Sequence, residues 1–180
     1  MATLPVSEFV EPLVSVEEYL QTSYRPDCEF VDGGIEERNV GEIEHGFLQA
    51  LLAQLFLNNR RTWGTLAFTD VRLQIAAERF RVPDVSVLVT GKPEERILVR
   101  PPLIVIEILS PEDRLSRLQE RIDDYLGFGV EHIWIFDPER RVAWFADRFG
   151  LHIPPSGELT VPETPIRVVL SELFAELERG

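Results

Sequence analysis

The 180-residue sequence predicts a single α/β domain, in which helices flank a mixed β-sheet. Two observations support this fold class. Alternating apolar and polar segments, typical of half-buried antiparallel strands, occur beside continuous apolar segments, typical of fully buried strands. Between residues 103 and 136, a strand, an amphipathic helix and a second strand follow one another, which predicts a right-handed crossover between parallel strands. A chain of this length can bury a sizeable core in one domain.

The composition is that of a globular protein in an aqueous compartment. Apolar residues make up 44% of the chain and charged residues 27%. No apolar run approaches the length of a membrane span, and residues 1–9 lack a basic start followed by an apolar segment. The single cysteine, Cys28, excludes an intramolecular disulfide and a cysteine-based zinc site. We therefore expect a cytoplasmic protein without membrane contact.

The N-terminal third predicts an arm followed by small elements. Residues 1–14 contain two prolines and are expected to form an N-terminal arm, so that the domain spans residues 15–180. Ser15 and Glu18 form a capping box for a short helix. Residues 28–37 predict a strand, a Gly-Gly turn and a returning strand. Glu29, on the first of these strands, is interpreted as an exposed strand residue.

A longer helix is predicted from residue 42 to about 58, because its apolar residues have helical spacing. Glu44 and His45 are expected on the same side as this apolar stripe. Two interpretations stay open. His45 is a core histidine with a polar partner and Glu44 a favourable charge at the helix start, or both residues border a metal site.

The middle of the chain predicts strands joined by short turns and one charged loop. A strand follows Gly64, residues 71–75 alternate as in a half-buried antiparallel strand, and residues 78–81 lead back into a buried strand at 85–89. A loop then holds Lys92, the only lysine of the chain. Pro101 and Pro102 delay the next strand until about Leu103.

The C-terminal half supplies the crossover. Ser110 and Pro111 favour a helix start, and the helix from about residue 113 to 128 is expected to end at Gly129. Its predicted buried face consists of Leu115, Leu118, Ile122, Tyr125 and Leu126. A buried strand at 133–136, a peripheral hairpin formed by 142–145 and 151–153, and a closing helix at 171–177 complete the domain.

Two carboxylates carry the main functional signal. Asp84 directly precedes the strand at 85–89, and Glu107 lies inside the strand at 103–109. Burying an unpaired carboxylate costs several kcal/mol, so two such residues on neighbouring strands indicate a shared metal ion or a shared substrate. Mg²⁺ prefers oxygen ligands, and one or two carboxylates with water molecules are sufficient to bind it.

Four segments resemble the Uma-type restriction endonuclease family, within the PD-(D/E)XK nuclease superfamily. They are Arg81-Val-Pro-Asp84-Val-Ser-Val, Ile104-Val-Ile-Glu107-Ile-Leu-Ser110-Pro111, Tyr125-Leu-Gly-Phe-Gly129-Val130 and Ile133-Trp-Ile-Phe-Asp137-Pro138. The resemblance extends over roughly residues 15–175 and implies a restriction endonuclease-like fold. It also implies Mg²⁺- or Mn²⁺-dependent hydrolysis of phosphodiester bonds in DNA.

The resemblance further implies roles for individual residues. Asp84, Glu107 and the carbonyl of Ile108 would bind the metal ion. His45 matches the family better than Glu44 as a residue of the first helix near the site. Glu29 occupies a position that in the family is an acidic residue near the site, so it stays a reserve candidate.

The family's catalytic lysine has no direct counterpart, because Leu109 occupies the lysine position of the Glu-x-Lys motif. In the family this lysine often lies on the next helix instead, at the position that is Arg121 here. Arg114, Arg117 and Arg121 fall within about 60° on a helical wheel. An arginine can bind a phosphate through two hydrogen bonds but cannot accept a proton at neutral pH. The alternative is a solvated arginine stripe, with Lys92 as another candidate for the missing amine.

The charge of the chain leaves other functions open. A net charge of −13 argues against a broad nucleic-acid footprint, which normally needs clustered basic residues. A binding protein that kept the nuclease fold and lost full activity is one alternative. A hydrolase or lyase acting on a small phosphorylated substrate is another. Trp144, Phe145 and Phe149 imply an apolar edge, from which we predict a homodimer.

Overall fold

The computed structural model describes residues 13–39, 42–89, 91 and 93–179. Its centre is a mixed six-stranded sheet in the order β10-β9-β8-β7-β6-β3. The strands are β3 (Thr65–Thr69), β6 (Val85–Val89), β7 (Ile104–Ile108), β8 (His132–Asp137), β9 (Val142–Asp147) and β10 (Gly150–His152). Only β7 and β8 pair in parallel; the other four pairings are antiparallel. The predicted α/β class with a mixed sheet is confirmed, with six strands instead of about five.

The predicted crossover joins the parallel pair. α3 (Leu115–Phe128) leaves β7 and returns the chain to β8, which pairs with β7 from Ile104↔His132 to Ile108↔Phe136. Gly129 ends the helix at a φ of 98°, a left-handed conformation that glycine adopts without strain.

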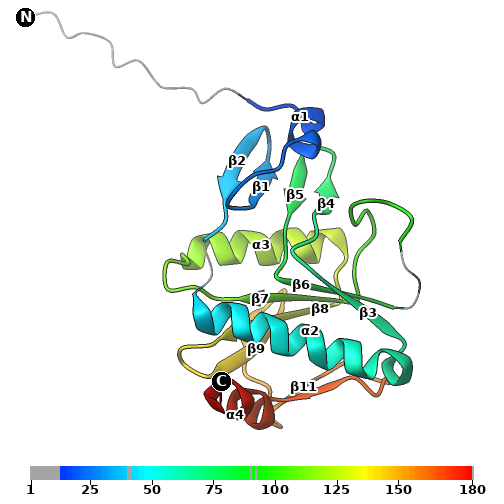
Figure 1. Cartoon of the computed structure of the whole chain (residues 1–180), viewed down its shortest axis with the longest axis vertical. Coiled ribbons are helices and arrows are strands. Elements are labelled where there is room, and N and C mark those ends of the chain that lie inside the picture. The colour runs from blue at the N-terminus through cyan, green and yellow to red at the C-terminus, as the bar shows by residue number, and fades with distance from the viewer. Residues whose placement is uncertain (1–12, 40–41, 90, 92, 180) are drawn as a thin grey trace, which may run out of the picture.

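Helices cover both faces of the sheet (Figure 1). On one face, α2 (Ile43–Trp63) and α4 (Leu170–Arg179) share a core with alternate strand residues, which include Val85, Val87, Ile104, Ile106, Trp134 and Phe136. On the other face, α3 packs against the residues between them, which include Val105, Ile133 and Ile135. The helices that carry Glu44 and Arg121, α2 and α3, therefore lie on opposite faces of the sheet.

A second, four-stranded sheet lies beyond α3 at the top of Figure 1. Its order is β2-β1-β5-β4, formed by β1 (Cys28–Val31), β2 (Gly34–Glu37), β4 (Leu73–Ala76) and β5 (Arg79–Arg81). Tyr19 of α1 (Val16–Gln21) packs against Phe30 and Phe80 of this sheet. Ser15 caps the helix as predicted, because its side chain accepts a hydrogen bond from the Glu18 amide. These segments were predicted individually, but not as one sheet.

Other element boundaries differ from the prediction. α3 begins at Leu115, two residues after the predicted start, where Asp113 accepts a hydrogen bond from the Ser110 amide at 2.7 Å. The prediction that Leu115 lies on the buried face is wrong, because its side chain is exposed. α2 continues to Trp63, five residues past the predicted end. A two-stranded sheet of β11 (Glu158–Thr160) and β12 (Arg167–Val169) was not predicted.

Two sequence predictions concern residues outside this description. Residues 1–12 of the predicted N-terminal arm and Lys92 lie outside the described residues. Across the part of the chain that is described, no helix has the length and apolar character needed to cross a membrane.

Candidate active site

Pairing of β6 with β7 brings Asp84 and Glu107 together. Val85 lies opposite Ile106, so the same register places Asp84 opposite Glu107. Both side chains are on the α3 side of the sheet, because Leu88 and Val105, which have the same strand parity, pack in the core under α3. Each residue is only 2% exposed. The two carboxylates on neighbouring strands are therefore adjacent and buried.

Three groups hold the Asp84 carboxylate. Oδ1 accepts a hydrogen bond from the Arg38 guanidinium, and Oδ2 accepts one from the Ile108 amide at 2.7 Å. Nε2 of His45 lies 3.5 Å from Oδ2. Burial favours the neutral acid, but His45, Arg38 and the Ile108 amide together hold the pKa of Asp84 below its ordinary value. Burial works against charging His45 as well, yet its contact with Asp84 raises the pKa of the imidazole.

Glu107 is held by two residues of α3. The Tyr125 hydroxyl donates a hydrogen bond of 2.5 Å to Oε1, and Arg121 Nε lies 3.6 Å from Oε2. Burial raises the pKa of Glu107 to about 7; the Arg121 charge opposes this rise and the Asp84 charge adds to it. Two adjacent carboxyls with pKa values shifted in opposite directions are typical of functional sites.

Arg121 itself is incompletely satisfied. Its Nη2 donates to Asp113 Oδ1 at 3.3 Å, whereas its buried Nε has no hydrogen-bond partner among the described residues. The charges of Glu107 and Asp113 raise the pKa of Arg121 against the effect of burial, so it stays a cation. The guanidinium therefore has an unused donor beside Glu107.

Next to the two carboxylates lies a second buried charge cluster, centred on Arg81. Arg81 is 1% exposed, and its guanidinium contacts carboxylates of both sheet and helix: Glu29 at 2.7 Å, Glu36 at 3.4 Å, Glu120 at 2.9 Å and Asp124 at 2.6 Å. The other oxygen of Glu29 accepts a hydrogen bond from the Val82 amide at 3.1 Å. The interpretation of Glu29 as an exposed strand residue is wrong: it is 4% exposed and anchors Arg81.

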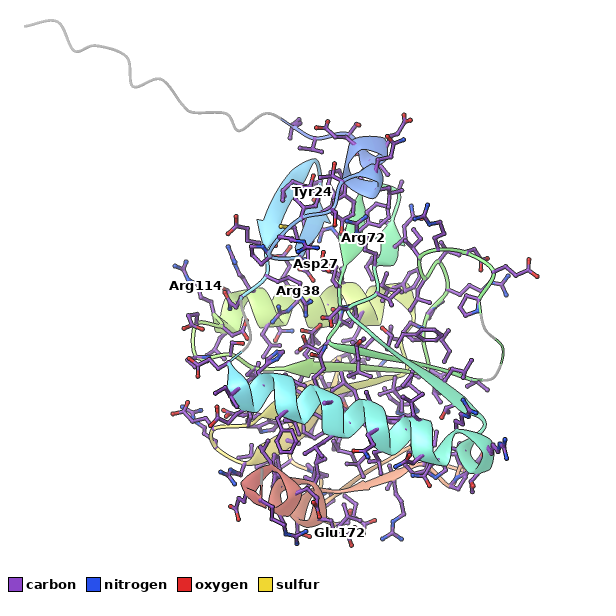
Figure 2. All side chains as sticks on the ribbon, in the orientation of Figure 1. Tyr24, Asp27, Arg38, Arg72, Arg114 and Glu172 are labelled. Atoms are coloured by element: carbon purple, nitrogen blue, oxygen red, sulfur yellow. The ribbon has the colours of Figure 1, made fainter. Side chains whose placement is uncertain are left out.

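The structure places the remaining candidate residues of α2 and α3 in different environments, some beside the carboxylates and some exposed. His45 contacts Asp84, but Glu44 is exposed, so the expectation that both residues point to the buried side is wrong for Glu44. Arg114, labelled at the start of α3 in Figure 2, and Arg117 are exposed and form no ion pair with any described residue.

Sequence reasoning missed several residues of the site. Arg38 follows β2 and reaches Asp84 only because β2 pairs with β1 and β1 pairs with β5, the strand that precedes Asp84, which no local pattern reveals. Gln49 donates to the Asp84 carbonyl and to Asp70 Oδ2, both at 2.9 Å. Tyr125 was assigned to the buried face of α3, and the need of a buried hydroxyl for a partner could have linked it to Glu107.

The oxygen-rich site suits a hard cation with few protein ligands. Among the described residues, no cluster of three or more His, Cys, Asp or Glu side chains is arranged to hold a metal ion. Two carboxylates with a backbone carbonyl and water molecules fit Mg²⁺, which is commonly bound by one or two carboxylates. The cleft between the small sheet and α3, lined in part by Arg38, Arg117 and Arg121, has a volume of about 20 Å³.

A larger hollow lies at the carboxyl ends of β7 and β8. It has a volume of about 610 Å³, and its lining includes His45, which contacts Asp84, and Asp113, which contacts Arg121. Arginines and apolar side chains line it together with several acidic residues: Arg114, Arg140, Arg141, Leu109, Leu115, Glu42, Glu44 and Glu139.

Comparisons with solved structures place this architecture among nuclease-like folds. A crystal structure described as a putative nuclease belonging to DUF820 from Anabaena variabilis ATCC 29413 superposes with a TM-score of 0.77 at 21% identity. The match covers 91% of this chain and 99% of that one. The structure of a DrdV–DNA complex matches with a TM-score of 0.41 and 17% identity, over 73% of this chain and 11% of that one. The second similarity is too low to support any inference.

A search of curated proteins finds no match. A family model, by contrast, matches residues 16–170, which is most of the chain and includes both carboxylates. The chain therefore belongs to the Uma2 family, described as "Putative restriction endonuclease".

Proposed function

We propose that this protein is a Mg²⁺- or Mn²⁺-dependent endonuclease that hydrolyses phosphodiester bonds in DNA. The observation that carries the proposal is the pair of buried, adjacent carboxylates, Asp84 and Glu107, with the cations Arg38 and Arg121 beside them. Family membership supports the reaction class.

Asp84, Glu107 and the carbonyl of Ile108 are the proposed metal ligands. The Ile108 amide donates to Asp84, and the N–H and C=O of one strand residue point to the same side, so the carbonyl faces the same edge. A divalent cation there would activate water and offset the charge that builds on the phosphate.

The surrounding residues have positioning roles in this proposal. Tyr125 fixes the orientation of Glu107, and His45 with the Ile108 amide fixes that of Asp84. Arg121 would place the charge of its guanidinium beside Glu107 and the scissile phosphate. Glu44 lines the adjoining hollow and has no role in the reaction as proposed.

A binding or interaction protein with weakened catalysis is the second candidate. It is favoured by the net charge of −13, by the absence of a lysine two residues after Glu107 and by the small volume of the cleft that Arg38 and Arg121 line. A hydrolase or lyase with a small phosphorylated substrate is the third candidate, because the same groups could bind that substrate.

The homodimer stays a prediction: Trp144 and Phe145 pack against the cores, while Phe149 is exposed. The cytoplasm remains the expected location.

The proposal is tested by incubating the protein with plasmid DNA and with single-stranded DNA, in Mg²⁺, in Mn²⁺ and in EDTA. We expect cleavage that depends on the metal and stops in EDTA. Binding of DNA without cleavage in any metal would favour the second candidate. Release of phosphate from small phosphate esters, with DNA left intact, would favour the third candidate, an enzyme that acts on a small phosphorylated substrate.

Arg121 should matter to cleavage more than the other arginines of its helix. Arg121→Ala is expected to lower the rate roughly 10- to 100-fold, because a charge-assisted hydrogen bond contributes about 1.5–3 kcal/mol. Arg121→Lys is expected to keep or raise the rate, because lysine also neutralises phosphate and has a pKa that can shift. The measurement is the single-turnover rate of DNA cleavage.

Arg114→Ala and Arg117→Ala are the matched controls on α3. These exposed residues are expected to change DNA affinity and its salt dependence, by a slope of about 0.9 for each phosphate that the variant no longer neutralises. Lys92→Ala belongs in the same series. A rate that is indifferent to Arg121 and lost with Lys92 would assign the missing amine to Lys92.

A further inference from the structure

We propose that Arg38 is an exchangeable counter-cation, which a divalent ion must displace from Asp84 in order to bind. This inference rests on the metal site of the proposed function. It gives a role to a residue that lies outside every motif of the sequence, directly after β2 of the small sheet.

Arg38 already occupies the position of a cation in this site. Its guanidinium binds Oδ1 of Asp84, and the charges of both Asp84 and Glu107 act on it. The Arg38 side chain is 15% exposed and that of Asp84 3%, so the pair has little access to water. Coulomb interactions are strong at such a position, and replacing one cation by another of higher charge is a substantial energetic change.

Arg38 and a divalent ion would compete for the same oxygen of Asp84, Oδ1. Oδ2 is directed at the Ile108 amide and at His45, which leaves Oδ1 as the oxygen facing a cation. A metal–oxygen distance of about 2.0–2.6 Å would put the ion in the space that the Arg38 nitrogen uses. Two cations could not share that position without strong repulsion.

Asp70 gives Arg38 a second partner. The other terminal nitrogen of Arg38 binds Asp70 Oδ1 at 2.8 Å, and the Asp70 side chain is 43% exposed. Gln49 holds the remaining Asp70 oxygen and the Asp84 carbonyl, which fixes the spacing between the two acids. Arg38 can therefore leave Asp84 and remain paired with Asp70, so the exchange does not leave the Arg38 charge without a partner. Figure 2 shows Arg38 where the small sheet meets α3.

The test measures Mn²⁺ affinity by isothermal titration and electron paramagnetic resonance, independently of DNA cleavage. Arg38→Gln is expected to bind Mn²⁺ at least tenfold more tightly than the wild type and to gain more in melting temperature. Asp70→Asn is expected to bind several-fold more weakly, because Arg38 then has only Asp84 as a partner. Arg72→Gln, a change at an arginine that lies over the Tyr19 ring, is the control with unchanged affinity.

A second readout separates exchange from a general effect of charge. The Arg38 Nε–H signal in a ¹⁵N spectrum, assigned by its loss in Arg38→Gln, should shift when Mg²⁺ is added. This readout uses the wild-type fold, so it holds even if Arg38→Gln does not fold, in which case Arg38→Lys provides the assignment.

The outcomes distinguish this inference from the proposed function. Mn²⁺ binding that Asp84→Asn abolishes, with equal affinity in Arg38→Gln and an unmoved Arg38 signal, would overturn the exchange and leave the metal site intact. Absence of Mn²⁺ binding from the wild type and from Arg38→Gln would overturn both. Tight binding confined to Arg38→Gln would support the exchange in its strongest form.

Discussion

Arg81→Met is expected to lower the free energy of unfolding by about 3–5 kcal/mol, the largest stability loss that we predict for a single substitution. Arg81 is 1% exposed and is the shared partner of Glu29 on β1 and Asp124 on α3. Methionine has a similar length, so packing is largely kept while Glu29 loses its counter-charge. Removing one partner of a buried ion pair leaves an uncompensated charge, which is costly.

Arg79→Met is the matched control, because Arg79 lies two residues earlier on the same strand and also contacts Asp124, at 2.8 Å. Its side chain is 23% exposed, so we expect a loss of about 1 kcal/mol or less. Urea unfolding measures both variants. Adding Glu29→Gln to Arg81→Met should recover part of the loss. Equal losses for the two arginines would show that burial of the Arg81 cluster does not determine its contribution.

Asp84→Asn and Glu107→Gln are expected to lower the rate of DNA cleavage by about 10³-fold or more. The physical reason is that a bound cation contributes several kcal/mol to stabilising the charged transition state, and each 1.4 kcal/mol is a factor of ten. Both substitutions keep the side-chain shape and remove the charge that would bind the ion. The measurement is the rate of plasmid cleavage at saturating Mg²⁺.

Asp123→Asn is the control for these two variants, because Asp123 is an exposed acid on α3 whose only described side-chain partner is Gln119. Its cleavage rate should stay within about twofold of the wild type, in line with the small effects of most surface substitutions. Wild-type rates in both Asp84→Asn and Glu107→Gln would remove the carboxylate pair from the mechanism.

Much of the fold could be predicted because its signals are local. The spacing of Leu48, Leu52 and Phe56 gives α2, and the strand–helix–strand order gives the parallel pair β7–β8. The small sheet could not be predicted in the same way. It requires Phe30 to pair with Phe80, fifty residues away, and short strands of three or four residues carry little periodicity.

The residues of the site also differ in whether a local sequence pattern marks them. Asp84 and Glu107 stand out in sequence because one directly precedes an apolar strand and the other lies inside one, and in the structure both are buried on adjacent strands. Arg38 and Asp70 contribute through side chains that converge from different sheets, so their sequence positions carry no signal. Glu29 was wrongly interpreted as exposed because it is an acidic residue on a short strand. Its burial is favourable because Arg81 supplies the counter-charge.

Mn²⁺ titration of the wild type and of the double variant Asp84→Asn with Glu107→Gln is the most direct measurement of whether these carboxylates share an ion. We expect the wild type to bind Mn²⁺ and to rise in melting temperature, because a ligand of the folded state stabilises it by mass action. The double variant should show neither effect. Equal binding and an equal rise in the double variant would place the ion elsewhere and contradict the proposed site.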